Sequence, residues 1–386
     1  MCNFGRLNLE SIDVKIFHGK EGFYKIKDDW DHIVNTMTHT RIGHVYEGYK
    51  AYIDALDEGD DQSIFFVLIH RNNKPIAICP MERTVKKVLG LKLCGLQIAL
   101  AKEIDIGDFI YEKRDDNKGL MNFLMEKLEK ALGYDWKCIT FLILEDSSIY
   151  FSLKNSQALL SMSVKEGSVY YLKFGSYEEI HKSVSKNFRG NLKQARNRLA
   201  RQDKVEFLSI RNKKDLNWAF QEFIEIEGGG WKGERGTSIK SDRQIKQFYE
   251  NSLIAFSNEG KCEINLLKVN DKSIAGSLCF LTDDTIYVTK VGYDENHSYL
   301  RPGLILFDEL IKRHSEDDSI REVNMCSDAS WFAKWKPLSM NVYRITIFNK
   351  SLGGLFYLAL FKCKSVKKKI NESFLNAIGK KNELHP

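Results

Sequence analysis

Apolar and polar residues follow the same order at two places in the chain. In residues 68–77, and again in residues 266–275, an apolar run is followed by a polar pair and a second apolar run. The pair is Asn-Asn in the first case and Asn-Asp in the second. Both residue types tolerate the left-handed backbone that tight hairpin turns require. The pattern therefore predicts two β-hairpins.

A further strand and then a helix are predicted after each hairpin. Apolar residues recur at spacings of three and four over residues 119–131 and over residues 303–313. This spacing is typical of the buried side of an amphipathic helix. Hairpin, strand and helix in the same order twice indicate a duplicated α/β unit. Between the two units, residues 183–201 predict a helix rich in lysine and arginine.

The duplication suggests how the chain is divided. We expect a first half at residues 1–165, a second half at residues 166–350 and a basic helical segment at residues 351–386. The last segment opens with an apolar decamer, Leu352 to Phe361, and has five lysines within residues 362–369. The decamer is shorter than the about 20 residues that span a bilayer. We interpret it as a buried helix, with contact to an anionic membrane surface as the less favoured alternative.

Composition places the chain among ordinary globular proteins. Hydrophobic residues make up 43% and charged residues 28% of its 386 residues. The formal net charge of +6 is too small over this length to indicate nucleic-acid binding, so we expect no DNA partner. None of the 8 cysteines forms a C-x-x-C pair, which predicts reduced thiols, no metal site and a cytoplasmic location. The first ten residues lack the apolar core of a signal peptide.

One stretch has the form of an anion-binding site. A predicted strand at residues 287–292 leads through a polar loop to Arg301, Pro302 and Gly303, where a helix begins. Helix N-termini present free N–H groups and the positive end of the helix dipole. Gly303 would let a phosphate approach the backbone, and Arg301 would add a charged contact. A plain strand-to-helix connection is the alternative.

A second stretch combines carboxylates with glycines. Glu225 and Glu227 end a predicted helix, and three glycines, Trp231 and Lys232 follow. Three glycines exceed what a helix C-cap needs. Either glutamate could act as a general base toward an amine. Two solvated glutamates at a helix end are the alternative.

Together these stretches resemble the BioF2-like or CelD-like acetyltransferase domains of the GNAT (Gcn5-related N-acetyltransferase) superfamily. Such proteins resemble tandem GNAT halves, as do the Fem-type aminoacyltransferases. The residues that carry the resemblance follow one another in order: 185–193, Glu227, 231–233, 236–237, 248–249, the hairpin through Ile274 and Ala275, 290–295 and 301–306. The resemblance is clearest over residues 175–340. It implies an α/β (α+β) fold of two tandem GNAT-like halves, each a mixed, mostly antiparallel sheet flanked by helices.

The resemblance also implies an N-acyltransferase that moves an acyl group, typically acetyl, directly from acetyl-CoA or another acyl-CoA to an amine without a metal. The residues expected to hold the donor are Lys290, Val291, Gly292, Arg301, Pro302, Gly303, Leu304 and Ile305. The candidates for the carboxylate that takes the proton of the amine are Glu227 first, Asp294 second and Asp328 third. The residues expected to contact the substrate are Trp231, Lys232 and Trp331.

The acceptor side is less well defined. The resemblance implies an acidic residue after the strand near residues 321–324, where this chain has Asn324. We expect the acceptor to be a small-molecule or glycan amine in envelope or polysaccharide synthesis. One alternative is an aminoacyl-tRNA or acyl carrier protein as donor, which the basic helix at residues 183–201 favours. Another is a non-catalytic binding module with a GNAT fold.

Overall fold

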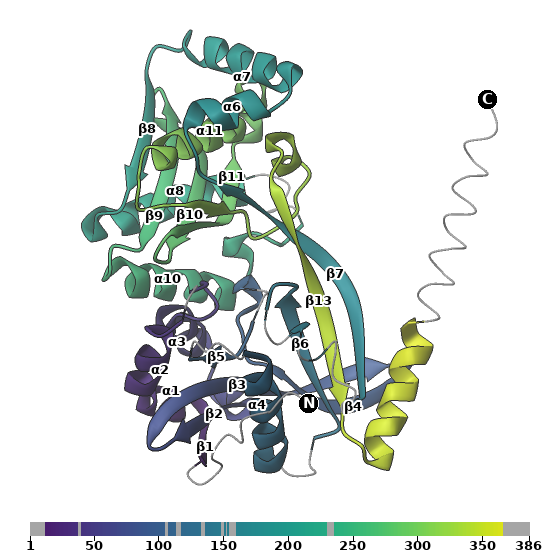
Figure 1. Cartoon of the computed structure of the whole chain (residues 1–386). Coiled ribbons are helices and arrows are strands. Elements are labelled where there is room, and N and C mark those ends of the chain that lie inside the picture. The colour runs from purple at the N-terminus through teal and green to yellow at the C-terminus, as the bar shows by residue number, and fades with distance from the viewer. Residues whose placement is uncertain are drawn as a thin grey trace, which may run out of the picture.

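Two lobes of mixed α/β structure follow one another along the chain (Figure 1). This computed structural model describes residues 12–37, 40–104, 107–112, 117–132, 136–147, 150–151, 153, 160–229 and 235–365. The predicted substrate contacts Trp231 and Lys232 lie outside the described residues.

The first lobe contains the first predicted hairpin. Its elements are β1 (Ile12–His18), α1 (Gly19–Lys25), α2 (Lys27–Val34), α3 (Tyr46–Ala55), η1 (Asp60–Ser63), β2 (Ile64–Arg71), β3 (Lys74–Val88), β4 (Leu91–Ile98), η2 (Lys102–Ile104), β5 (Ile110–Tyr111), α4 (Asn117–Leu132) and β6 (Cys138–Leu144). Asn72 and Asn73 have φ of 49° and 61° in the β2–β3 turn, so the predicted left-handed turn is confirmed. Phe23 and Trp30 pack in one buried cluster of this lobe, and Leu124 and Leu128 pack in another.

The second lobe repeats the hairpin, strand and helix. Its elements are β7 (Leu160–Lys173), α6 (Tyr177–Ser183), α7 (Lys186–Leu199), β8 (Val205–Ile210), α8 (Lys213–Gly228), η3 (Ile239–Ser241), α10 (Arg243–Ser257), β9 (Cys262–Val269), β10 (Lys272–Leu281), β11 (Thr285–Tyr293), η4 (Glu295–Leu300), α11 (Pro302–Ser315), β12 (Glu322–Asn324), η5 (Phe332–Trp335) and β13 (Leu338–Phe348). Asn270 and Asp271 have φ of 50° and 65° in the β9–β10 turn. Phe220 and Phe223 of α8 pack in one buried cluster, and Leu310 and Ile311 of α11 pack in another.

One sheet joins the two lobes. Within the described residues its strand order is β1-β2-β3-β4-β6-β13-β7-β12-β11-β10-β9-β8, and β5 pairs with β3. Strand β13 comes from the end of the second lobe, yet it pairs antiparallel with β6 of the first lobe and with β7. Figure 1 shows β7 and β13 as two long strands that run from one lobe into the other. The expected boundary between residues 165 and 166 falls inside β7. The division of the chain into these two halves therefore stays a proposal.

A helix at residues 352–365 follows β13 and lies against the first lobe. The Phe361 ring contacts the Phe348 ring at a centroid distance of 5.5 Å, and Cys94 N–H donates to Tyr357 Oη at 3.2 Å. The decamer is helical, but the prediction of a buried helix is wrong: Leu352, Leu355 and Phe356 are exposed, and Tyr357 and Phe361 are only partly buried. Within the described part of the chain, no helix has both the length and the apolar character needed to cross a bilayer.

Candidate active site

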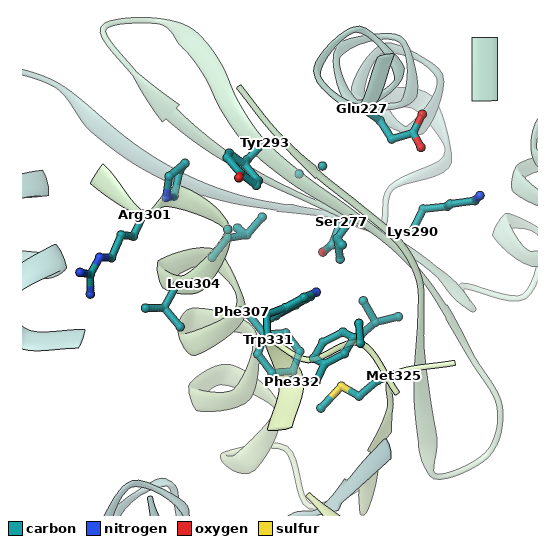
Figure 2. Close-up of a pocket in the computed structure, with 18 of the residues that line it drawn as sticks. Glu227, Ser277, Lys290, Tyr293, Arg301, Leu304, Phe307, Met325, Trp331 and Phe332 are labelled. Atoms are coloured by element: carbon teal, nitrogen blue, oxygen red, sulfur yellow. The ribbon is translucent and has the colours of Figure 1, made fainter. Parts of the chain in front are cut away.

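Strands β11 and β12 run parallel at their starts and then separate. Their paired residues are Thr285 with Glu322, Ile286 with Val323 and Tyr287 with Asn324. There β12 ends, whereas β11 continues to Tyr293. The second part of β11 faces a cavity of about 780 Å³ (Figure 2). A strand edge that has left its neighbour presents backbone N–H groups, which can bind a carbonyl oxygen.

The N-terminus of α11 forms another wall of this cavity. Arg301 is its N-cap residue and has a left-handed backbone, with φ of 54° and ψ of 50°. Pro302 occupies the first helical position, and the N–H groups of Leu304 and Ile305 donate to Arg301 O at 3.1 and 3.2 Å. The sharp left-handed turn aims the first turn of α11 at the cavity, where a helix N-terminus favours an anion.

The structure brings most of the predicted donor residues together. Lys290, Val291 and Gly292 of β11 and Arg301, Pro302, Gly303 and Leu304 of the α11 start line the cavity. Ile305 instead faces the core and is fully buried, because it lies on the inner side of α11. A β-carbon at Gly303 would meet Tyr293 Cδ1 at 3.6 Å, an ordinary contact, so packing alone does not demand glycine there.

Glu227 reaches the cavity from the last turn of α8. Its side chain is 2% exposed, and its Oε2 accepts a hydrogen bond from Ile239 N–H at 2.9 Å. Figure 2 shows Glu227 on the α8 side of β11, with Arg301 and Leu304 on the α11 side. Glu225 points elsewhere and pairs with Lys240 at the surface. Of the two helix-end glutamates, Glu227 is therefore the one that lines the cavity.

The other two predicted carboxylates lie outside the cavity lining. Asp294 caps η4, accepting hydrogen bonds from Asn296 N–H at 3.0 Å and from Lys272 Nζ at 2.7 Å. The hydrogen bond from Lys272 is the main cause that lowers the pKa of Asp294 to about 2, which makes it a weak base. Asp328 is exposed and accepts a hydrogen bond from Ser168 Oγ at 3.0 Å.

Aromatic rings close one end of the cavity. Trp331, a predicted substrate contact, lies with its ring centroid 5.5 Å from that of Phe307 and 3.6 Å from that of Phe332. Phe188 of α7 and Met325 line the same region. Figure 2 shows Phe307, Trp331, Phe332 and Met325 grouped beside β11. This end of the cavity is suited to an apolar group rather than to a charged one.

Ser277 is a cavity residue that the sequence analysis did not single out. It lies on β10 opposite Asn265 of β9 and is almost fully buried. Asn265 Nδ2 donates to Ser277 Oγ at 3.2 Å, and Cys279 Sγ donates to the same oxygen at 3.7 Å. Since the hydroxyl accepts from Asn265, its own hydrogen can donate to a group bound in the cavity.

A buried ionic cluster fixes the orientation of Asn265. Arg313 Nη2 donates to Asn265 Oδ1 at 2.7 Å, and a guanidinium can only donate, so the amide NH₂ must face Ser277. Arg313 in turn pairs with the fully buried Glu263, which Arg211 and His314 also contact. Burial disfavours the charge on Glu263, but His314, Arg313 and Arg211 outweigh it and hold the pKa of that carboxyl well below its usual range. The hint in the sequence is a glutamate and an asparagine near the start of a largely apolar strand.

Comparison with known proteins agrees with this geometry. Residues 186–336 match the family model described as an acetyltransferase (GNAT) domain. That segment begins with α7 and ends just after η5. It contains all the residues that line the cavity. A comparison with curated proteins by sequence finds no match.

Solved structures share the fold over most of the chain. FemX matches with a TM-score of 0.53 and 11% identity, over 85% of this chain and 96% of FemX. The C-terminal domain of a protein assigned as a lysylphosphatidylglycerol synthetase, from Agrobacterium fabrum, matches with a TM-score of 0.50 and 11% identity, over 87% and 95% of the two chains. A conserved protein of unknown function from Bacteroides thetaiotaomicron matches with a TM-score of 0.50 and 12% identity, over 84% and 97%. Residues 186–336 are therefore an acetyltransferase (GNAT) domain, and it is part of a fold that FemX shares over most of the chain.

Proposed function

We propose that this acyltransferase moves an acyl group directly from acyl-CoA to an amine, with the donor held between the separated strands β11 and β12. The observation that carries the proposal is one cavity, lined both by β11 beyond the end of β12 and by a helix N-terminus. A thioester needs carbonyl polarisation and CoA needs a site for its pyrophosphate. The strand edge and the helix start, which line the same cavity, would supply these two features.

The pyrophosphate of the donor would rest on the first turn of α11. There the Gly303 N–H and the positive end of the helix dipole would face the phosphates, and Arg301 adds a cation at the cavity wall. The pantetheine arm would then follow β11 toward Lys290. Ser277 would donate its hydroxyl hydrogen to a carbonyl oxygen of the arm or of the thioester.

The transfer step would take place beside Glu227. The amine nitrogen attacks the thioester carbonyl carbon, and backbone N–H groups of β11 stabilise the oxyanion. Glu227 accepts the proton that the amine loses. The carbon–sulfur bond then breaks, the amide forms and CoA leaves as the thiolate. Because Glu227 lies on the α8 side of β11 and α11 on the other side, donor and acceptor would enter from opposite faces. Holding the two together supplies much of the acceleration.

The acceptor would be a primary amine on a small molecule or a glycan. The aromatic group of Phe307, Trp331 and Phe332 offers a flat apolar surface of the kind on which sugar rings and acyl chains pack. We assign Trp331 to this contact, together with Trp231 and Lys232 as candidates from the sequence.

A second candidate is a Fem-like transfer from aminoacyl-tRNA, or from an acyl carrier protein. The shared fold with FemX favours it. The basic helix α7 supports it less than its composition suggested, because several of its cations have partners inside the protein. Arg196 pairs with Asp308 and Glu309, and Arg189 and Arg198 donate to backbone carbonyls.

Titration of the purified protein with CoA, acetyl-CoA, aminoacyl-tRNA and an acyl carrier protein distinguishes the two donors. We expect CoA and acetyl-CoA to raise the unfolding temperature, with about 2.7 kcal/mol of stabilisation at a hundred times Kd. We also expect calorimetry to find one donor per chain. Stabilisation by aminoacyl-tRNA or by the carrier protein, with no effect of CoA, would replace the proposal with the second candidate.

A further inference from the structure

The helix at residues 352–365 is apolar on both of its sides, although the protein covers only one of them. Tyr357 and Phe361 face inward, against β4 and Phe348. Leu352, Leu355 and Phe356 face outward, and Leu352 is 87% exposed. A helix that is apolar all round is normally buried on every side. The outward side of this helix is therefore the kind of surface that a partner protein or a lipid bilayer normally covers.

The turn between β3 and β4 presents a second group of exposed apolar side chains. Val85, Leu89 and Leu91 are all exposed, and Val85 is 64% exposed. Leu89 has a positive φ of 51°, which is uncommon for a leucine and costs free energy. Isolated exposed apolar residues are common on proteins, but a cluster at one place marks an interaction site.

The fold places these two segments together although more than 250 residues separate them in the sequence. The hydrogen bond from Cys94 N–H to Tyr357 Oη joins β4 to the helix. Figure 1 shows the β3–β4 hairpin reaching the C-terminal helix, at the opposite end of the molecule from α11. We call the exposed residues of the two segments, Val85, Leu89, Leu91, Leu352, Leu355 and Phe356, the apolar patch.

Within the two segments that form the apolar patch, every charged residue is a cation. Residues 83–96 contain Arg83, Lys86, Lys87 and Lys92 and no aspartate or glutamate. Residues 350–365 contain three lysines and likewise no acidic residue. Burial is the main cause that lowers the pKa of Lys86, and Arg344 and Lys364 lower it further, whereas Glu82 acts in the opposite direction. An apolar surface with a cationic rim is complementary to an anionic bilayer.

We propose that the apolar patch and its lysines bind the surface of an anionic lipid bilayer, with Leu352, Leu355 and Phe356 entering the boundary between headgroups and acyl chains. Apolar insertion and attraction of lysines are two separate signals, and stable peripheral attachment generally needs two. The cavity between β11 and β12 lies at the other end of the molecule, so a bound chain still exposes its active site.

Electrostatic repulsion disfavours two other ways to cover the apolar patch, a second copy of the chain and the C-terminal residues of the same chain. A two-fold dimer through it would bring two sets of seven cations face to face. Residues 366–386 of the same chain have five lysines and two glutamates, so their net charge is also positive.

Sedimentation of the full chain with lipid vesicles tests the proposal. We expect binding to phosphatidylcholine vesicles that contain phosphatidylglycerol, weaker binding at high salt, and little binding to phosphatidylcholine alone. The double variant Leu352→Glu/Phe356→Glu should lower the affinity by about tenfold or more, because it removes the inserted side chains. Lys87→Glu/Lys92→Glu should lower it mainly at low salt.

A matched control is Ile254→Glu, which changes an apolar side chain that is 62% exposed on α10 of the other lobe. It should leave vesicle binding unchanged, and unchanged thermal unfolding of each variant would show that the fold is intact. No sedimentation with anionic vesicles at low salt would overturn the proposal, as would wild-type binding by Leu352→Glu/Phe356→Glu. A dimer in solution that this double variant dissociates would also overturn it, because the apolar patch would then be an interface between copies.

Discussion

Gly292 lies directly against the backbone of Glu227. A β-carbon at position 292 would come within 2.8 Å of Glu227 Cα and 3.2 Å of Glu227 N. Both are atoms of the α8 backbone, so neither can swing away as the end of a flexible side chain could. The donor strand β11 thus fixes the position of the proposed base through a contact that only glycine allows.

The first prediction follows from this contact. Gly292→Ala should push the end of α8 away from β11, which lowers kcat and costs about 1–3 kcal/mol of unfolding free energy through overpacking. Chemical denaturation and steady-state kinetics measure the two effects. Gly190→Ala is the matched control, because nothing lies within 4 Å of the added carbon in α7. That control should stabilise the protein by up to about 1 kcal/mol. Unchanged turnover in Gly292→Ala would contradict the role of this contact.

The second prediction concerns the base itself. Glu227→Gln keeps the shape of the side chain and can still accept from Ile239 N–H, but it cannot take a proton. We expect kcat to fall by about 10²–10⁴-fold while the Kd for CoA stays the same. Glu225→Gln serves as control, since Glu225 is exposed and paired with Lys240. A wild-type rate for Glu227→Gln at every pH would assign the proton transfer to another group.

The third prediction tests the phosphate site. Gly303→Glu puts a carboxylate at the cavity wall beside the first turn of α11, where it would repel a pyrophosphate. Its β-carbon makes only an ordinary contact with Tyr293, so the fold should persist. We expect CoA no longer to raise the unfolding temperature of this variant, whereas Gly303→Ala should still respond to CoA. If Gly303→Glu binds CoA with wild-type affinity, the donor phosphates lie elsewhere.

The fourth prediction concerns Ser277. Ser277→Ala removes a hydroxyl from the cavity lining, and the loss of one hydrogen bond should weaken donor binding by about 0.5–1.5 kcal/mol. Calorimetry with acetyl-CoA measures this directly. Asn265→Asp should act in the same direction, because a carboxylate would draw the Ser277 hydrogen away from the cavity. Unaltered donor affinity in both variants would mean that the network serves stability alone.

The sequence predicted those features of the fold that depend only on residues close together in the chain. The hairpins followed from asparagine and aspartate at positive φ, and the α11 start followed from Arg301, Pro302 and Gly303. The placement of Ile305 needed the helix to be docked, since only packing decides which side of α11 faces the cavity. Residue spacing carries no information on contacts between separate strands. The hydrogen bond between Asn265 and Ser277 and the pairing of β13 with β6 are two such contacts.

The insertion of β13 also constrains how the protein is made. Strand β6 has β4 on one side, but its other neighbour, β13, is translated only after nearly two hundred further residues. At ribosomal rates this leaves the second edge of β6 open for roughly 10–40 s. An open edge of apolar strand recruits other chains, so nascent copies on crowded polysomes are at risk of pairing with each other. Slower initiation or a holding chaperone should therefore raise the soluble yield more than any change in codon usage that slows elongation within the second lobe.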